Sequence, residues 1–155
     1  MKPDQITRAQ LIKDLAHCPE IVAADATFLY ELLHPERDRI DIRYSLARAS
    51  LPVGQSSLPH RLQTSEVYYI LAGRGLMTIA GESNPIQAHQ AIYVPPGAIQ
   101  FLANIGDEPL VFLCIVDPAW QPEDEEVLVC RPDDKELGKK TCVYEDPGKN
   151  MSDGI

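Results

Sequence analysis

His60, Glu66 and Tyr68 bring an imidazole, a carboxyl and a phenol group into one short segment. Residues an even number of positions apart on a β-strand point to the same side of a sheet, so strand structure here would place all three on one face. Leu62 and Ile70 would share that face. An imidazole and a carboxyl that converge are what a ligand or metal site needs, and a phenol beside them can transfer a proton. This segment is therefore the first candidate for chemistry.

The elements that must position these groups are predicted to be short strands. Residues 66–71 and 110–116 are rich in β-branched and aromatic side chains, and apolar residues alternate over residues 40–46. Phe28–Leu33 is compatible with a helix or a strand. Turn signals separate the segments, at residues 52–54, 73–75, 81–85, 95–97 and 106–107. Many short strands with frequent turns predict a sandwich or a jelly-roll barrel.

The ends of the chain differ from its middle. Thr7 and Gln10 are spaced as in a capping box, and apolar residues up to Leu15 share one helical face, so we expect a short amphipathic helix that ends before Pro19. After Trp120 the composition becomes polar, which predicts a polar C-terminal tail. The histidines at positions 17, 34 and 89 are expected at the surface or in turns.

Composition bounds the class of protein. A chain of 155 residues matches one domain. The formal charge of -9 repels phosphate backbones and anionic lipid, so we expect no nucleic acid or membrane partner. The N-terminus is charged throughout, and the longest apolar run is too short to span a bilayer. The four cysteines form no C-x-x-C pair and are expected to be free thiols. We therefore expect a cytoplasmic protein.

Gly54, His60, Glu66 and Gly73 have the order and spacing of the first cupin motif, which this chain resembles. Residues 89–104 resemble the second cupin motif. The resemblance implies an all-β cupin jelly-roll barrel, the double-stranded β-helix. It also implies a single domain over residues 1–155, with a barrel core at about residues 40–118, an N-terminal extension at 1–39 and a C-terminal extension at 119–155. The face that carries His60 and Glu66 would then be the barrel interior.

The chain departs from the family pattern at three positions. Leu62 stands for the second histidine of the first motif, Gln100 for the histidine of the second motif, and His89 for its opening glycine. The metal ligands that the resemblance implies are therefore His60, Glu66 and Gln100. An amide and a carboxylate beside one imidazole would suit Mn, Fe or Zn with several waters.

Glu66 would be costly in a barrel interior unless something compensates its charge. A metal, a hydrogen-bonded cluster without metal, and exposure to solvent remain open. Tyr68 is the first candidate for a catalytic proton transfer, and filling of the barrel by its ring is the alternative. Arg43 and Arg61 could meet an anionic substrate at the barrel mouth.

The leading hypothesis is a small cupin with an interior divalent metal that acts on or binds a small oxygen-rich metabolite. The resemblance allows dioxygenase, isomerase, lyase and decarboxylase activities and does not select among them. The alternative is a metal-free, non-catalytic cupin for small-ligand binding, sensing or assembly. Apolar surface in the strands ahead of Gly54 and around residues 11–15 predicts a homodimer.

Overall fold

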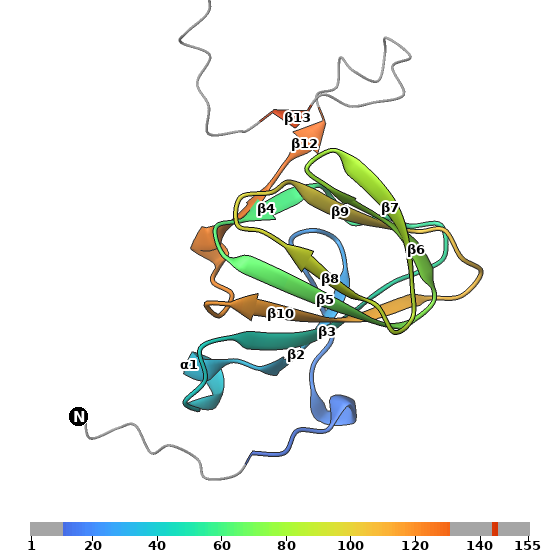
Figure 1. Cartoon of the computed structure of the whole chain (residues 1–155). Coiled ribbons are helices and arrows are strands. Elements are labelled where there is room, and N and C mark those ends of the chain that lie inside the picture. The colour runs from blue at the N-terminus through green and yellow to red at the C-terminus, as the bar shows by residue number, and fades with distance from the viewer. Residues whose placement is uncertain (1–10, 131–143, 146–155) are drawn as a thin grey trace, which may run out of the picture.

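The structure is a computed structural model that describes residues 11–130 and 144–145. Two antiparallel sheets face each other and form a barrel (Figure 1). The predicted all-β fold is confirmed. Within the part of the chain that the structure describes, no helix is long and apolar enough to cross a membrane.

Sheet A has the strand order β1-β2-β3-β10-β5-β8, and sheet B has the order β11-β4-β9-β6-β7. The strands of sheet A are β1 (Ile21–Val22), β2 (Phe28–Leu33), β3 (Ser45–Leu51), β10 (Leu110–Asp117), β5 (Ser65–Ala72) and β8 (Ala91–Val94). Those of sheet B are β11 (Glu125–Val127), β4 (His60–Leu62), β9 (Gln100–Asn104), β6 (Arg74–Ile79) and β7 (Glu82–Gln87). The remaining elements are the pair β12 (Val129–Cys130) and β13 (Tyr144–Glu145), the helix α1 (Pro35–Asp38), and the 3₁₀ helices η1 (Leu15–His17) and η2 (Pro122–Asp124).

The core lies between the two sheets and follows the alternation of β5 and β10. Ile70 and Phe112 are opposite each other in neighbouring strands and are almost fully buried. Further along the same two strands, Glu66 is opposite Val116, so the inward face becomes polar there. The barrel is thus packed with apolar side chains in one part and carries ionisable groups in the other.

Backbone conformation explains the roles of the residues at two positions, Gly73 and His89. Gly73 has a φ of 89° in the turn from β5 to β6, and a Cβ there would lie 2.7 Å from the carbonyl oxygen of Pro109. Only glycine fits such a position. His89 has a φ of 70° in the exposed turn before β8, which is the left-handed conformation that a glycine would adopt without strain. His89 is therefore a turn residue.

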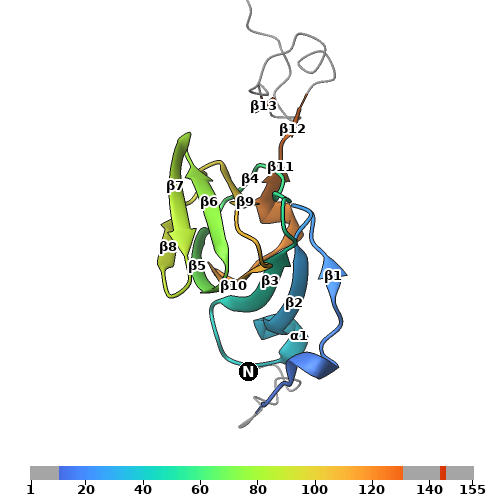
Figure 2. The same cartoon turned by 90° about the vertical axis from the view of Figure 1, so that its right-hand side faces the viewer.

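The segments on both sides of the predicted barrel core add strands to the barrel. Phe28–Leu33, compatible with either structure in the sequence, forms β2 and pairs with β3. At the other end, β11 pairs with β4. In Figure 2, β1 and β2 lie on the opposite side of the barrel from β6 and β7. The domain boundaries at about residues 40 and 118 stay a prediction.

Two expected elements differ from the structure. Residues 40–44 are irregular and β3 begins at Ser45, because the chain must cross over from α1, whose C-cap Arg39 has a φ of 55°. The predicted N-terminal helix lies partly outside the described residues. Its described part holds only η1, preceded by irregular chain at residues 11–14.

Candidate functional site

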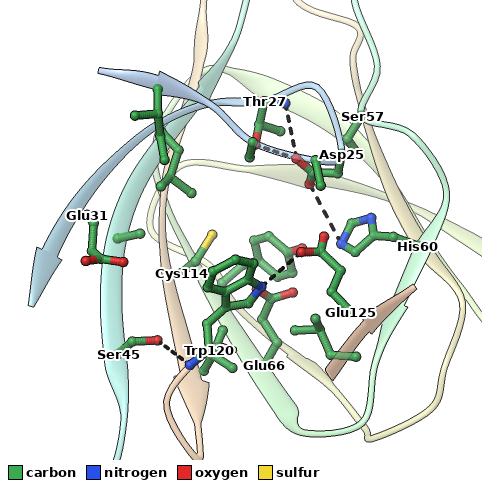
Figure 3. A pocket seen from close by; sticks show the side chains of 18 of the residues that line it. Asp25, Thr27, Glu31, Ser45, Ser57, His60, Glu66, Cys114, Trp120 and Glu125 are labelled. Carbon is green, nitrogen blue, oxygen red and sulfur yellow. Dashed lines mark hydrogen bonds and ion pairs between the residues drawn. The ribbon is translucent and has the colours of Figure 1, made fainter. Parts of the chain in front are cut away.

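A cavity of about 240 Å³ lies inside the barrel, between strands β2, β3, β10 and β5 of sheet A and strands β4, β9 and β11 of sheet B. Much of its wall is apolar, with Leu29, Leu46, Leu62, Leu102, Phe112 and Val116. Ionisable side chains gather on one part of the wall, and Figure 3 shows the carboxyl groups of Asp25, Glu66 and Glu125 turned toward the same space as the His60 ring. This combination of an apolar wall and a few convergent polar groups is typical of a ligand site.

His60, only 3% exposed, presents one ring nitrogen to this space because the other is bound to the backbone. Nδ1 lies 2.8 Å from the oxygen of Leu58, and since a carbonyl oxygen only accepts, Nδ1 carries the hydrogen. Nε2 faces Asp25, whose Oδ2 lies 3.7 Å away, too far for a hydrogen bond. Asp25 is itself fixed, because Thr27 donates to its Oδ1 from N at 3.1 Å and from Oγ1 at 2.7 Å. Nε2 and Oδ2 therefore remain for a ligand.

Glu66, Gln100 and Tyr68 form a buried hydrogen-bonded chain. The phenol of Tyr68 donates to Oε1 of Gln100 at 2.6 Å, and Nε2 of Gln100 donates to Oε1 of Glu66 at 2.8 Å. Burial raises the pKa of Glu66, although His60, Tyr68 and Gln100 act in the opposite direction. Burial, followed by the Glu66 charge, raises the pKa of Tyr68 well above its ordinary value. Tyr68 therefore stays a neutral donor.

Glu125 and Trp120 form a second polar pair in the cavity wall. The indole nitrogen of Trp120 donates to Oε2 of Glu125 at 2.9 Å. The Trp120 backbone is held by Ser45, whose Oγ accepts from N at 2.9 Å, and by His34, whose Nε2 donates to O at 2.9 Å. His34, expected at the surface, is fully buried. Burial raises the pKa of Glu125, and the charge of His60 and the Trp120 hydrogen bond lower it by less.

Carboxyl groups outnumber cations around the cavity. Arg37 also lines the cavity, but its Nη1 lies 3.2 Å from Oε2 of Glu31, so that charge is already paired. The three carboxyls that remain, on the β1–β2 loop, β5 and β11, have His60 as the nearest basic group in this part of the wall. Arg43 and Arg61, which could meet an anionic substrate, pair with Asp117 and with a glutamate of β11.

Of the predicted metal ligands, His60 and Gln100 are opposite each other in β4 and β9, and Gln100 is hydrogen-bonded to Glu66. His60 and Glu66 line the cavity, but the carbonyl of Gln100 already accepts from Tyr68 and its amide nitrogen is bound to Glu66. Leu62 supplies only apolar wall. Among residues 11–130 and 144–145, no group of three or more His, Cys, Asp or Glu side chains is placed to hold a metal ion. These residues fit a hydrogen-bonded cluster better than a resident metal, and occupancy by Mn, Fe or Zn stays a prediction.

Sequence reasoning missed Asp25, Trp120 and Glu125. All three lie outside the motif segments, and long-range pairing brings them to the site: Glu125 is opposite Leu62 in β4, and the oxygen of Asp25 accepts from the nitrogen of Leu58 at 2.7 Å. The Asp-x-Thr turn at residues 25–27 was the only local signal, and it indicates a turn without indicating a site.

Comparison with known proteins agrees with the architecture. Residues 47–116 match the cupin domain family. An uncharacterized protein of Methanocaldococcus jannaschii is 42% identical over 108 residues, 69% of this chain and 86% of that protein. The oxalate-binding protein of Thermotoga maritima is 34% identical over 71 residues, 45% of this chain and 59% of that protein. The solved structure of a predicted oxalate decarboxylase from Thermotoga maritima is 23% identical, with a TM-score of 0.62 over 70% of this chain and 99% of that chain. On its motifs, its barrel and its family match, this chain belongs to the cupin superfamily.

Proposed function

We propose that this cupin binds a small organic molecule in its barrel cavity without a resident metal, through the buried cluster of His60, Glu66, Gln100 and Tyr68. The observation that carries the proposal is the joining of Glu66 to Tyr68 through Gln100, beside a cavity whose wall combines apolar side chains with a few polar groups. Burial raises the pKa of Glu66, so this carboxyl favours a ligand group that compensates its charge. The apolar wall would receive the body of the ligand.

The cavity volume limits the ligand. An apolar cavity of about 150 Å³ accommodates benzene, and this cavity has about 240 Å³. A ligand with one small ring or a short branched chain fits this volume. Larger molecules would require the loop between β1 and β2, which contributes Asp25 to the wall, to move.

Oxalate is not the ligand that this cavity favours, although two relatives carry oxalate in their names. Oxalate is a dianion, and it would face the carboxyls of Asp25, Glu66 and Glu125 with Arg37 already paired to Glu31. Repulsion between like charges in a buried site costs several kcal/mol. We therefore do not extend oxalate binding to this chain.

The contacts of Tyr68 fit a role in positioning the binding site better than a role in catalysis. Its phenol oxygen donates to Gln100, and the ring packs on Phe112 with centroids 5.5 Å apart. In this arrangement Tyr68 positions Gln100, which in turn positions Glu66. If the site catalyses a proton transfer, Glu66 and His60 are the groups that face the ligand.

The test is a thermal-shift screen of small metabolites on protein treated with a chelator. A ligand at a hundred times its Kd stabilises the folded state by about 2.7 kcal/mol, which a melting curve detects. Ala47→Phe would fill the cavity and should abolish the shift, whereas Ala91→Phe on exposed strand β8 should keep it. Shifts that require added Mn, Fe or Zn would contradict metal-independent binding and restore the metal hypothesis.

We also infer that the chain works as a homodimer in the cytoplasm. Strand β1 lies at the edge of sheet A and exposes Ile21 and Val22, and Tyr93 is 62% exposed on β8 at the other edge. A second copy that covers one of these edges would bury the apolar side chains there. Light scattering at micromolar concentration should return twice the mass of the chain, and a monomer mass of 17.2 kDa would contradict the dimer.

A further inference from the structure

We propose that the cavity selects a small organic cation, a primary amine on a compact apolar body, and rejects carboxylates. This inference rests on the proposed function and names the class of ligand. Its basis is that Asp25, Glu66 and Glu125 share the cavity with the single imidazole of His60 and with aromatic side chains.

The charges around the cavity favour a cation. The three carboxyls come from three separate parts of the chain, and each is held in place by the protein: Asp25 by Thr27, Glu66 by Gln100, and Glu125 by Trp120. Each carboxyl has a second oxygen to offer to a ligand. A cation placed among them would offset their mutual repulsion, which a neutral ligand would leave in place and an anion would increase.

The aromatic side chains of the cavity wall also favour an amine. Trp120, Tyr68 and Phe112 all line the cavity. Aromatic rings attract ammonium groups electrostatically, most strongly when the site is desolvated. Acidic oxygens and aromatic rings in one cavity therefore recognise an amine by two independent means.

The size of the cavity suits an organic cation better than a metal ion. A metal needs three or more donors that converge on one point at about 2.0–2.6 Å. The acidic side chains instead lie along one part of the wall of a cavity of about 240 Å³, and the described residues contain no such convergent group. An ammonium group with an apolar body can fill this space.

Trp120 provides the readout, because it is the only tryptophan in the sequence and it lines the cavity. The probes are benzylamine, benzyl alcohol and benzoate, which share one ring and differ in charge. Their binding to chelator-treated protein is followed by tryptophan fluorescence. We expect benzylamine to bind at least about tenfold more tightly than benzyl alcohol, since a hydrogen bond to a charged group contributes about 1.5–3 kcal/mol. Benzoate should bind more weakly than both.

The outcomes distinguish this inference from the proposed function. If benzyl alcohol or benzoate binds as tightly as benzylamine, the selection of a cation is wrong and ligand binding in the cavity stands. If none of the three changes the fluorescence while the metabolite screen yields a ligand, the amine class is again wrong. If the screen also yields none, the proposed function fails with it.

Variants test which carboxyls carry the selection. Asp25→Asn keeps an oxygen for Thr27 and Glu125→Gln keeps one for Trp120, so each removes charge with little change in local structure. Each should weaken benzylamine about tenfold and leave benzyl alcohol nearly unchanged. Glu123→Gln is the matched control, because it changes the net charge equally at an exposed position outside the cavity wall. An equal loss in the control would indicate a long-range charge effect and contradict the site.

The pH dependence gives a further check. Burial raises the pKa of Glu66 and of Glu125, so these carboxyls ionise more fully as pH rises, and benzylamine affinity should increase from about pH 5 to about pH 8. The other titratable and charged groups around them are Asp25 on the loop, Glu31 on β2, Arg37 on α1, His60 on β4, Tyr68 on β5 and Cys114 on β10. An affinity that falls over this range would contradict a cation held by these carboxyls.

Discussion

Gln100 holds Glu66 through a hydrogen bond of 2.8 Å from its amide nitrogen, and both side chains are buried. The position at which the cupin pattern carries a histidine is here occupied by a side chain that both donates and accepts. The amide thereby links the carboxyl of Glu66 to the phenol of Tyr68.

Gln100→Leu should destabilise the fold strongly, because it leaves the Tyr68 hydroxyl and the Glu66 carboxyl buried without their partner. Each unsatisfied group costs about 1–3 kcal/mol, so we expect a loss of about 2–6 kcal/mol. Urea unfolding measures it. Gln87→Leu, at an exposed position on β7, serves as the control and should change stability by less than about 0.5 kcal/mol. Equal effects of the two substitutions would show that the hydrogen-bonded chain adds little.

Glu66→Gln should become increasingly stabilising as pH rises. Burial raises the folded-state pKa of Glu66 above its ordinary value of 4.5, so the folded chain retains a proton that the unfolded chain has lost. The native free energy of unfolding therefore falls as pH rises from about 4 toward the raised pKa, by about 1.4 kcal/mol for each pH unit that separates the folded and unfolded pKa values. The glutamine has no such titration and can still accept from Gln100. Melting curves of the native chain and of Glu66→Gln are compared from about pH 4 to pH 8. A constant difference between their melting temperatures would contradict a raised pKa of Glu66.

Leu62→His should create or strengthen metal binding. Leu62 is buried on the same face as His60 and Glu66, so a new imidazole there completes three protein ligands. Titration calorimetry with Mn, Fe(II) and Zn should give weak binding to the native chain and tighter, stoichiometric binding to the variant. Leu71→His places an imidazole on the exposed face of β5 and should not bind metal. Tight stoichiometric binding by the native chain would instead support the predicted ligands His60, Glu66 and Gln100.

Gly73→Ala should cost far more stability than Gly81→Ala. Both glycines have positive φ values, 89° and 84°, and differ in the space around them. A Cβ at Gly73 meets backbone atoms of Pro109 at 2.7 Å and of Leu110 at 2.9 Å, whereas at Gly81 nothing lies within 4 Å. We expect about 1–2 kcal/mol at Gly81 from the backbone alone, and about 1–3 kcal/mol more at Gly73. Denaturant unfolding compares them, and equal losses would show that the turn at Gly73 relaxes freely.

The fold was predictable from local patterns. Strand alternation placed His60, Leu62, Glu66, Tyr68 and Ile70 on one face, and all five are buried. The same reasoning was wrong over residues 40–44, where apolar alternation is present but the chain must instead connect α1 to β3. The path of the chain between two elements determines the structure of such a segment. The hydrophobic periodicity of its sequence does not show that it is a connection.

The site was only partly predictable. His60 and Glu66 lie in the cavity wall as their motif positions implied, because a motif on a strand fixes the face of its residues. The partners of Gln100 could not be read from the sequence, since its two hydrogen bonds join residues 32 and 34 positions away. Asp25 and Glu125 were missed for the same reason: loop packing and an added strand bring them to the cavity.

The family match ends at residues 47 and 116, and the acidic residues that surround His60 come from both sides of those limits. Within the matched barrel lie His60 and Glu66, whereas Asp25 precedes it and Glu125 follows it. On the proposed function, substitutions in the segments that flank residues 47–116 would change ligand preference and leave the matched barrel unaltered. A chimaera that keeps residues 47–116 and takes the flanking segments from another cupin would retain His60 and Glu66. It would present these two side chains to a different class of molecule.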